Sequence, residues 1–417
     1  MSERKILCID LKSFYASVEC ALRGLDPFLT PLVVADKGRG GGSIVLAVSP
    51  YLRKLGFPSR CRIYELPEKT DLIFAKPRMN TYIEYAIKVL DIYLDFVSDE
   101  DLFVYSIDEV FLDVTNYLKY YQSTAEELAK KILKTIEEKL KISATCGIGP
   151  NMLIAKFALD LESKTTKTGI ANWDYTDIPE KLWPIKELKK IWGIGTRMER
   201  NLNRLGIHSV YDLAHYDVKR LKKHFGVIGV ELSNHAHGRD KSLIQDQQQL
   251  KSINQSYSVG QVLFKDYGKK SAMLIIKEMV DDLTRRLRLN KKMCQTIRLA
   301  VSYSKEYGGG FSRQARLLEK TNSTTKLIKA FLEIFNKFYE NKPLRKISVS
   351  VTNLTTETTI QLNLFEDYQS QNIEKMLDSA IDEIKLDYGK DAIDRATVLL
   401  DESTKRQRNQ TVGGHNA

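Results

Sequence analysis

The sequence lacks any apolar run long enough to cross a membrane, and no apolar signal-peptide core lies near its start. Cysteine is scarce as well: the five cysteines are scattered, and no pair has the spacing of a metal site with a second pair or with histidines. These absences argue against a membrane protein, a zinc domain and a disulfide-stapled secreted fold. We therefore expect a cytoplasmic protein with reduced thiols.

A glycine signature for phosphate binding is also missing. The loop Gly38-Arg-Gly-Gly-Gly42 has no Gly-Lys-Ser/Thr ending, which excludes a P-loop there. Of 417 residues, 43% are hydrophobic and 28% are charged, which is typical of a soluble globular protein with about two to four domains. The net charge of +11 suits a polyanionic partner, although a basic enzyme without such a partner would show the same charge.

Two adjacent acids, Asp108 and Glu109, lie within an apolar and β-branched stretch from Val104 to Val114. The stretch has no proline or glycine, and it predicts one strand or a tight hairpin of two short strands. Neighbouring side chains point to opposite faces of a strand, whereas at a turn they can converge. An acidic pair beside a core needs a cation to offset its charge, so the pair indicates either a cation site or a solvated turn.

A third acid ends a second apolar stretch. Ile6 to Ile9 predicts a short buried strand that stops at Asp10. Asp10, Asp108 and Glu109 would form a cluster of three carboxylates on neighbouring strands, which cannot all ionise cheaply without a metal. Magnesium suits such oxygen ligands, and a pair of magnesium ions is how polymerases activate a hydroxyl and stabilise the leaving pyrophosphate.

These acids belong to two motifs that carry a family resemblance. The segments Asp10-Leu-Lys-Ser-Phe-Tyr-Ala-Ser-Val-Glu19 and Ser106-Ile-Asp-Glu-Val-Phe-Leu-Asp113 resemble the palm motifs of Y-family translesion DNA polymerases, in particular the UmuC-like branch of Gram-positive bacteria. The resemblance extends to about residue 365. It implies a DNA-templated DNA polymerase of low fidelity that tolerates damaged templates, with a role in DNA repair and the SOS response.

The resemblance also assigns the acids their roles. Asp10, Asp108 and Glu109 would be catalytic, and together with the backbone carbonyl of Leu11 they would bind two Mg²⁺ ions. Two alternatives remain. A related DNA-binding adaptor without catalysis would not need the three acids, and another palm-like nucleotidyl enzyme, such as a cyclase, would have no evident use for the DNA-binding segments further along the chain.

The implied fold is a multidomain α+β fold with the shape of a right hand. Its parts are a palm with an antiparallel sheet plus helices, small fingers, a helical thumb with a helix-hairpin-helix, and an α+β little finger. We expect the C-terminal tail to be flexible apart from one helix around residues 373–384. The expected boundaries are 1–13 and 80–178 for the palm, 14–79 for the fingers, 179–240 for the thumb, 241–252 for a polar linker, 253–355 for the little finger and 356–417 for the tail.

The resemblance places Phe14, Tyr15 and Arg53 at the incoming nucleotide. An aromatic residue at the position of Tyr15 is the family's steric gate, whose ring fills the space of a ribose 2′-hydroxyl; a plain packing tyrosine is the alternative. The guanidinium of Arg53 suits a phosphate. The family's tyrosine three residues earlier is replaced here by Pro50, and Tyr51 follows one residue later.

A lysine after the last palm helix contacts the triphosphate in the family. Lys164 matches this position, but the spacing is one residue longer than usual, so Lys167 remains possible. For both lysines the alternative is a solvated surface position.

The segment Ile191 to Ile207 predicts two helices joined by Gly-Ile-Gly, which is typical of a helix-hairpin-helix. Glycines let a phosphate approach the backbone, and the following helix presents free N–H groups, so such contacts position a duplex without reading its sequence. An ordinary helical hairpin is the alternative. The candidate DNA-binding residues are Gly193, Ile194, Gly195 and Arg197. A basic cluster between Arg285 and Arg298 would be a second grip on the duplex.

A short motif near the end resembles the peptide that bacterial polymerases insert into a sliding clamp. Its anchors are Gln361, Leu362, Leu364 and Phe365, and the alternative is an edge strand of the last sheet. The implied partners are primer–template DNA, deoxynucleoside triphosphates and the bacterial sliding clamp. We expect a monomeric catalytic subunit.

Overall fold

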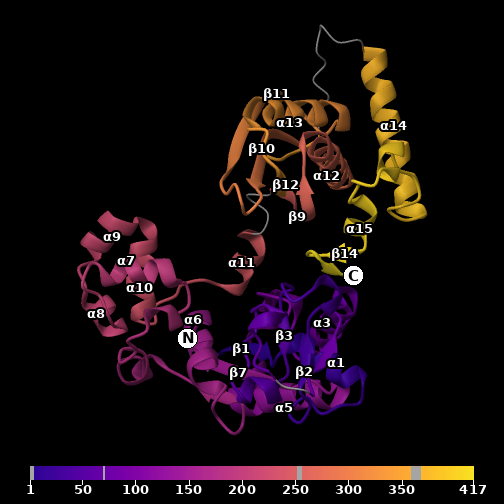
Figure 1. The fold of residues 1–417 in the computed structure, drawn as a ribbon. Helices are drawn as coiled ribbons and strands as arrows, with labels where there is room; N and C mark the ends of the chain where they lie inside the picture. The colour runs from indigo at the N-terminus through magenta and orange to yellow at the C-terminus, as the bar shows by residue number, and fades with distance from the viewer. Residues whose placement is uncertain (1–3, 69–70, 251–255, 358–367) are drawn as a thin grey trace. The chain divides into compact units, whose positions relative to one another are not determined.

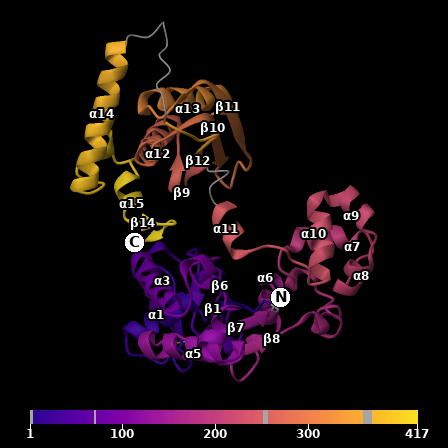
Figure 2. The ribbon, with the colours of Figure 1, turned by 180° about the vertical axis from the view of Figure 1, so that it is seen from behind.

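A computed structural model describes residues 4–68, 71–250, 256–357 and 368–417, and the chain divides into two compact units, Met1–Leu250 and Lys251–Ala417 (Figures 1 and 2). Across these ranges, no helix combines the length and the apolar character that a membrane crossing requires. The two units are described in turn.

The first unit is built on a five-stranded sheet with the strand order β5-β6-β1-β7-β8. The central strand β1 (Ile6–Leu11) is antiparallel to both β6 (Glu109–Asp113) and β7 (Ala144–Gly149). At the edges, β5 (Leu102–Val104) pairs antiparallel with β6, and β8 (Ile170–Asn172) pairs parallel with β7. The acidic stretch is therefore a hairpin of two short strands.

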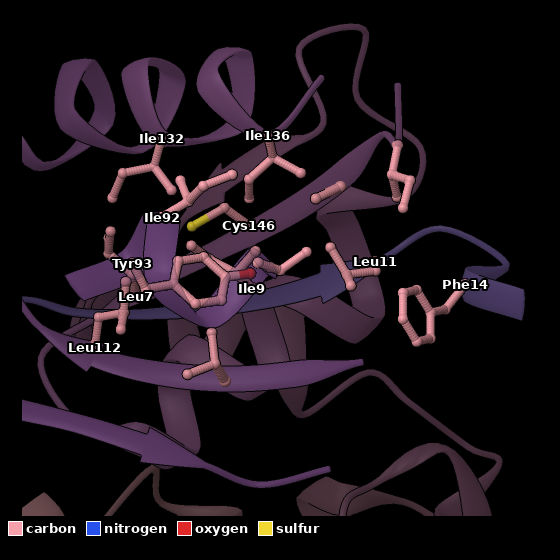
Figure 3. Close-up of a cluster of buried hydrophobic side chains, with 14 of the residues drawn as sticks. Leu7, Ile9, Leu11, Phe14, Ile92, Tyr93, Leu112, Ile132, Ile136 and Cys146 are labelled. Atoms are coloured by element: carbon pink, nitrogen blue, oxygen red, sulfur yellow. The ribbon is translucent and has the colours of Figure 1, made fainter. Parts of the chain in front are cut away.

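Helices cover both faces of this sheet, and the alternation of side chains along β1 assigns each residue to a face. Figure 3 shows Leu7, Ile9 and Leu11 in a core with Ile92 and Tyr93 of α3 (Met79–Leu94) and with Ile132 and Ile136 of α5 (Ala125–Leu140). The intervening residues face a smaller cluster formed with α6 (Met152–Ala158). Asp10 continues this second row, so its side chain lies on the α6 face.

The segment predicted as fingers contains a three-stranded sheet of order β3-β2-β4. Its helix α1 follows β1 directly and contributes to the core of the palm sheet, whereas α2 packs with the small sheet. The elements are α1 (Phe14–Leu22), β2 (Leu32–Val34), β3 (Ala47–Val48), α2 (Pro50–Lys54) and β4 (Ile73–Ala75), and a short helix α4 (Tyr117–Tyr121) follows the palm hairpin.

Four short helices form the segment predicted as thumb, around a core of leucine and isoleucine side chains. They are α7 (Thr196–Asn203), α8 (Val210–His215), α9 (Val218–Phe225) and α10 (Val227–Ala236). The first helix of the predicted hairpin motif is only one 3₁₀ turn, Leu188–Lys190. Pro184 and Gly193 bound this segment, and both residue types interrupt helices.

Part of the predicted linker is a helix. α11 (Ile244–Leu250) begins with Ile244, which is fully buried among side chains of β1, β6 and α6. Gln245 donates a hydrogen bond to Asp101 at 3.1 Å. Residues 244–250 are therefore anchored on the palm, because one apolar side chain in a polar stretch finds a buried position there.

The second unit has a sheet of order β11-β10-β12-β9, with α12 and α13 packed on one of its faces (Figures 1 and 2). Its elements are β9 (Tyr257–Tyr267), α12 (Lys269–Leu289), β10 (Lys292–Tyr303), β11 (Gly310–Thr321), α13 (Thr324–Phe338), β12 (Leu344–Thr352) and β13 (Thr355–Thr356), which pairs with β10.

The tail is folded, contrary to the prediction of a flexible end. It comprises α14 (Tyr368–Asp387), a 3₁₀ turn (Ala396–Leu399), α15 (Lys405–Asn409) and a hairpin of β14 (Thr411–Val412) and β15 (His415–Asn416). Ion pairs join it to α12: Arg288 to Asp382 at 2.6 Å, and Lys405 to Asp281 at 2.7 Å. These partners are far apart in the sequence, so no local sequence pattern predicts the ion pairs.

Candidate active site

The three predicted acids meet at one end of β1 and β6. Asp10 and Glu109 are direct partners in the antiparallel register, and both belong to the face covered by α6. Asp108 lies in the turn before β6, where its carbonyl accepts a hydrogen bond from Leu11 N at 2.9 Å. Ser106 Oγ donates to the Asp108 carboxylate at 2.6 Å. The hairpin turn thus brings Asp108 to the strand end that carries Asp10.

Two lysines and a fourth acid complete the cluster. Lys156 Nζ lies 2.7 Å from Glu109 Oε1 and 3.0 Å from Asp160 Oδ2. Lys164 Nζ lies 3.1 Å from Asp10 Oδ2 and 3.1 Å from Asp160 Oδ1. Lys156 and Asp160 were not predicted as site residues. The available signal was their spacing of four residues, at which opposite charges pair on a helix.

A π-helical segment, Leu159–Ser163, carries the chain from α6 to Lys164. A π-helix accommodates one more residue per hydrogen-bonded turn than an α-helix and is frequent at functional sites. The segment ends directly before the predicted triphosphate lysine, Lys164. Within the described part of the chain Asp10 pairs with Lys164 and not with Lys167, which favours Lys164 as the site lysine.

The electrostatics of the site follow from burial and crowding. Burial raises the pKa of Asp10, the nearby Asp108 adds to this rise, and Lys164 opposes it. Burial likewise raises the pKa of Glu109 against the pull of Lys156. For Lys156, burial alone would lower the pKa, but the surrounding acidic groups outweigh it and raise the value. Carboxylates crowded in this way favour a bound cation.

The donor set fits a hard divalent cation by its chemistry. Asp10, Asp108 and Glu109 offer carboxylate oxygens, the ligands that magnesium prefers, at the end of rigid strands. Within the described ranges, no three His, Cys, Asp or Glu side chains are arranged to hold a metal ion as they stand. Lys156 and Lys164 supply the positive charge there instead.

Tyr15 is held in place by a stack of side chains behind it. Its ring lies 4.5 Å from the ring of Tyr82, at an interplanar angle of 21°. The hydroxyl of Tyr82 donates to Glu19 at 2.8 Å, and Arg78 pairs with the same buried carboxylate at 2.8 Å. Burial raises the pKa of Tyr15, and the charge of Asp108 raises it further.

The other residues predicted at the nucleotide differ in accessibility. The side chain of Phe14 is buried in the palm core (Figure 3), so only its backbone could face a nucleotide. Arg53 is exposed on α2 and donates to Ser59 Oγ at 2.9 Å. Pro50 occupies the first turn of α2, where proline is favoured, and Tyr51 packs against the fingers core.

An additional cation lies near this part of the site. Arg60 is exposed, and its charge lowers the pKa of Tyr15 against the larger effect of burial. Sequence reasoning missed Arg60 because the residue lies outside the segment that resembles the family's phosphate-binding motif.

The thumb loop presents backbone to solvent. Gly193 and Gly195 are exposed, and Gly193 has a φ of +88°, which favours glycine. Ile194 between them is buried and fixes the loop to the thumb core. Gly195 caps the start of α7, next to the exposed side chain of Arg197. The loop has the exposed N–H groups and the cation that suit a phosphate.

The basic cluster predicted in the little finger is divided between two faces. Arg285 and Arg288 lie near Asp382 of α14, so these two cations are directed toward the tail. Arg298 lies on the sheet face opposite α12 and α13, where it pairs in register with Gln314 and Ser350. The same face carries Arg316, Lys346, Ser312 and Ser348. The small and basic side chains of this face suit a nucleic-acid backbone.

The predicted clamp motif lies outside the described residues. Its predicted anchors are Gln361, Leu362, Leu364 and Phe365.

Comparison with known families and proteins gives consistent matches along the chain. Residues 9–160 match the model of the impB/mucB/samB family, residues 254–364 match its C-terminal domain, and residues 175–207 match the family's HHH motif. The putative UV-damage repair protein UvrX of Bacillus subtilis is 39% identical over 99% of this chain and 97% of its own. DNA polymerase IV 2 of the same organism is 32% identical over 100% of this chain and 99% of its own.

The fold has a counterpart among solved structures. A chimeric Y-family DNA polymerase matches with a TM-score of 0.66 and 22% identity, over 84% of this chain and 99% of its own. This likeness confirms the predicted multidomain α+β architecture. With full-length relatives above 30% identity, the chain belongs to the impB/mucB/samB family, and the resemblance to UmuC-like Y-family polymerases is confirmed.

Proposed function

We propose that the protein is a DNA-templated DNA polymerase that extends primers past damaged template bases. One observation carries the proposal: Asp10, Asp108 and Glu109 meet at one strand end in a chain whose full-length relatives bear the name DNA polymerase IV. The UV-damage repair name of another relative agrees with a role on damaged templates. A non-catalytic adaptor would have no use for this cluster of crowded carboxylates.

The acids would hold divalent cations. Asp10, Asp108, Glu109 and the carbonyl of Leu11 would bind two magnesium ions, which lower the pKa of a primer 3′-hydroxyl and stabilise leaving pyrophosphate. The chain's own contribution is to place these oxygens at the end of β1 and β6. The hydrogen bond from Leu11 N to the Asp108 carbonyl keeps the turn beside the central strand.

Cationic side chains would bind the triphosphate, and an aromatic ring would distinguish deoxyribose from ribose. Lys164 lies beside Asp10, and Arg53 presents an exposed guanidinium that suits a phosphate. Tyr15, backed by Tyr82, would fill the space of a ribose 2′-hydroxyl and thereby exclude ribonucleotides. The backbone of Phe14 would border the same nucleotide.

Two surfaces would bind DNA through its backbone. In the first unit, Gly193, Ile194, Gly195 and Arg197 form a loop at a helix start. In the second unit, the open sheet face around Arg298 is basic and rich in serine. Neither surface needs to read bases, which fits an enzyme that meets many template sequences.

Two further expectations remain proposals. Gln361, Leu362, Leu364 and Phe365 would bind the sliding clamp as an extended peptide, and the protein would act as a monomeric catalytic subunit in the cytoplasm. Clamp-dependent stimulation that is lost on replacing Leu364 and Phe365, with bare-template extension retained, would support the motif.

Primer extension tests the proposed function directly. The full chain is incubated with magnesium, four deoxynucleotides and a primer on either an undamaged template or one with a single abasic site. We expect extension on both templates. DNA binding measured by fluorescence anisotropy distinguishes the alternatives: an adaptor would bind without extension, and a nucleotide cyclase would do neither.

A further inference from the structure

Three charged side chains lie in a row beside the candidate acids: Lys156 on α6, Asp160 in the π-helical segment and Lys164 directly after it. We propose that Lys164 is an exchangeable cation that neutralises Asp10 until a divalent metal binds there, and that Asp160 retains Lys164 at the site after the exchange. The inference rests on the proposed function, because it assumes that Asp10 is a metal ligand.

The two lysines differ in how firmly they are held. The Lys156 side chain is 9% exposed and pairs with Glu109, whose side chain is 10% exposed. The Lys164 side chain is 45% exposed, and its contacts are longer, at 3.1 Å to both Asp10 and Asp160. A buried ion pair is costly to break, whereas a half-exposed one contributes little. Lys164 can therefore leave Asp10, while Lys156 stays with Glu109.

Asp160 determines where Lys164 goes. It contacts both lysines, and Lys156 fixes it from the buried side. A divalent cation on Asp10 would repel the ammonium group, but Asp160 would still attract it. The flexible stem of a lysine lets its ammonium group turn without backbone movement. Lys164 would then be close to the metal and free to bind a triphosphate oxygen.

Exchange of this kind couples two ligands. A metal that releases Lys164 from Asp10 prepares the same lysine for the nucleotide, and by thermodynamic reciprocity the nucleotide favours the metal. Asp160 is a positioning residue in this scheme, since it acts through the two lysines.

Metal binding without DNA or nucleotide tests the exchange. The binding of Mn²⁺ to the full chain is measured by electron paramagnetic resonance for the wild type, Lys164→Gln, Lys164→Arg and Lys167→Gln. Removing the competing cation should tighten Mn²⁺ binding by about two- to fivefold in Lys164→Gln. Lys164→Arg keeps the charge and should bind Mn²⁺ like the wild type. Lys167→Gln removes a nearby charge that does not pair with Asp10, and its affinity should not change.

Several results would overturn the proposal. If Lys164→Gln binds Mn²⁺ like the wild type, or if Lys167→Gln tightens binding equally, Lys164 does not compete at Asp10. Polymerase activity could then still stand, because primer extension measures it separately. A wild type that extends primers but binds no Mn²⁺ at this site would contradict the exchange alone; one that does neither would contradict the proposed function as well. Thermal melting of each variant confirms folding.

Lys164→Gln should weaken the binding of the incoming nucleotide, although it tightens the binding of the metal. In steady-state extension at saturating magnesium, Lys164→Gln should raise KM for the incoming nucleotide by about two- to fivefold, with a smaller change in kcat. Tighter metal and weaker nucleotide binding in one variant is the signature of an exchanged cation. A lysine with a merely structural role would change neither, and an unchanged KM would contradict the second half of the proposal.

Discussion

At the scale of single residues, the proposed gate residue Tyr15 is supported by side chains that are buried behind it. Glu19 is fully buried, and Arg78, Arg23 and Tyr82 satisfy its carboxylate. This network fixes the ring of Tyr82, and Tyr82 supports the ring of Tyr15. The exclusion of ribonucleotides by Tyr15 would thus depend on the buried ion pair of Glu19 and Arg78 behind it.

Replacing Tyr15 by Ala should open the space of the 2′-hydroxyl. Overpacking of that kind costs about 1–3 kcal/mol, so the preference for deoxynucleotides over ribonucleotides should fall by roughly 5- to 150-fold. Deoxynucleotide extension should remain. Single-nucleotide insertion with each sugar measures the ratio, and Tyr120→Ala, an exposed aromatic residue on α4, serves as the control. Unchanged discrimination in a folded variant would make Tyr15 a packing residue only.

Glu19 gives a prediction about pH. Burial alone would raise its pKa, but hydrogen bonds from Arg78, Arg23 and Tyr82 outweigh burial and hold the pKa below the ordinary value of 4.5. A carboxylate with a lowered pKa stabilises the fold fully above its unfolded value, and this contribution is lost as pH falls through the folded value. Glu19→Gln should therefore cost about 1–3 kcal/mol near pH 7.

The cost should shrink below about pH 4.5. Melting temperatures of the wild type and Glu19→Gln between pH 3 and 8 measure this difference. Glu84→Gln, an exposed acid on α3, should melt like the wild type throughout. A gap between wild type and Glu19→Gln that widens on acidification would contradict the assignment.

At the scale of secondary-structure elements, local patterns predicted some features and could not predict others. The apolar run of Ile6 to Ile9 and the β-branched residues around Asp108 predicted β1 and the hairpin, because burial on a sheet selects such residues. The π-helical segment Leu159–Ser163 was not predictable, because no residue type or period in the sequence distinguishes it from a continuation of α6. The family resemblance revealed only that the spacing between the last palm helix and Lys164 is one residue longer than usual.

The folded tail was missed for a related reason. Its Lys- and Arg-rich composition is typical of a flexible end, but Lys405 is buried and pairs with partly buried acids on α12 and after α14. Ion pairs between residues so far apart in the sequence produce no periodic pattern from which they could be predicted. The helix α14 itself was predicted around residues 373–384, and it extends further at both ends.

Lys405→Met should loosen the tail. It would remove a cation that is now 3% exposed and lies 2.7 Å from Asp281 and 2.9 Å from Asp394, and both acids would keep longer contacts to a second buried cation, Lys385, at 3.6 and 3.3 Å. Because Lys385 remains, the cost should be smaller than the about 3–5 kcal/mol of leaving a buried charge unpaired. Hydrogen exchange of residues 368–417 should accelerate, while exchange in the palm sheet stays unchanged. Arg406→Met, at the exposed neighbouring position, is the matched control; equal protection in both variants would show that the pair does not hold the tail.

At the scale of the whole molecule, the structure shows which side chains of the net charge of +11 are exposed and which are paired within the chain. Some of the cations that the sequence suggested for DNA, such as Arg288, are neutralised within the chain. Others remain exposed, at Arg197 in the thumb and Arg298 on the open sheet. Overall charge alone therefore overstates the surface available to DNA.

DNA affinity should fall steeply with salt and depend little on sequence. If the thumb loop and the sheet face together contact about five phosphates, the logarithm of the affinity should fall with the logarithm of salt at a slope of about −4 to −5. Anisotropy titrations at salt concentrations from about 50 to about 300 mM measure the slope. Arg298→Ala should reduce it by about one, and a flat response would exclude backbone tracking by these surfaces.

Single-turnover primer extension by Asp108→Ala measures whether the acids at the end of β1 and β6 perform nucleotidyl transfer. Loss of one metal ligand should remove several kcal/mol of transition-state stabilisation, so the rate should fall by at least about a hundredfold. DNA affinity should stay within about twofold, because the phosphate contacts lie elsewhere. Asp91→Ala, an exposed acid on α3, should extend like the wild type. Extension by Asp108→Ala at a rate near that of the wild type would show that these acids do not perform the reaction.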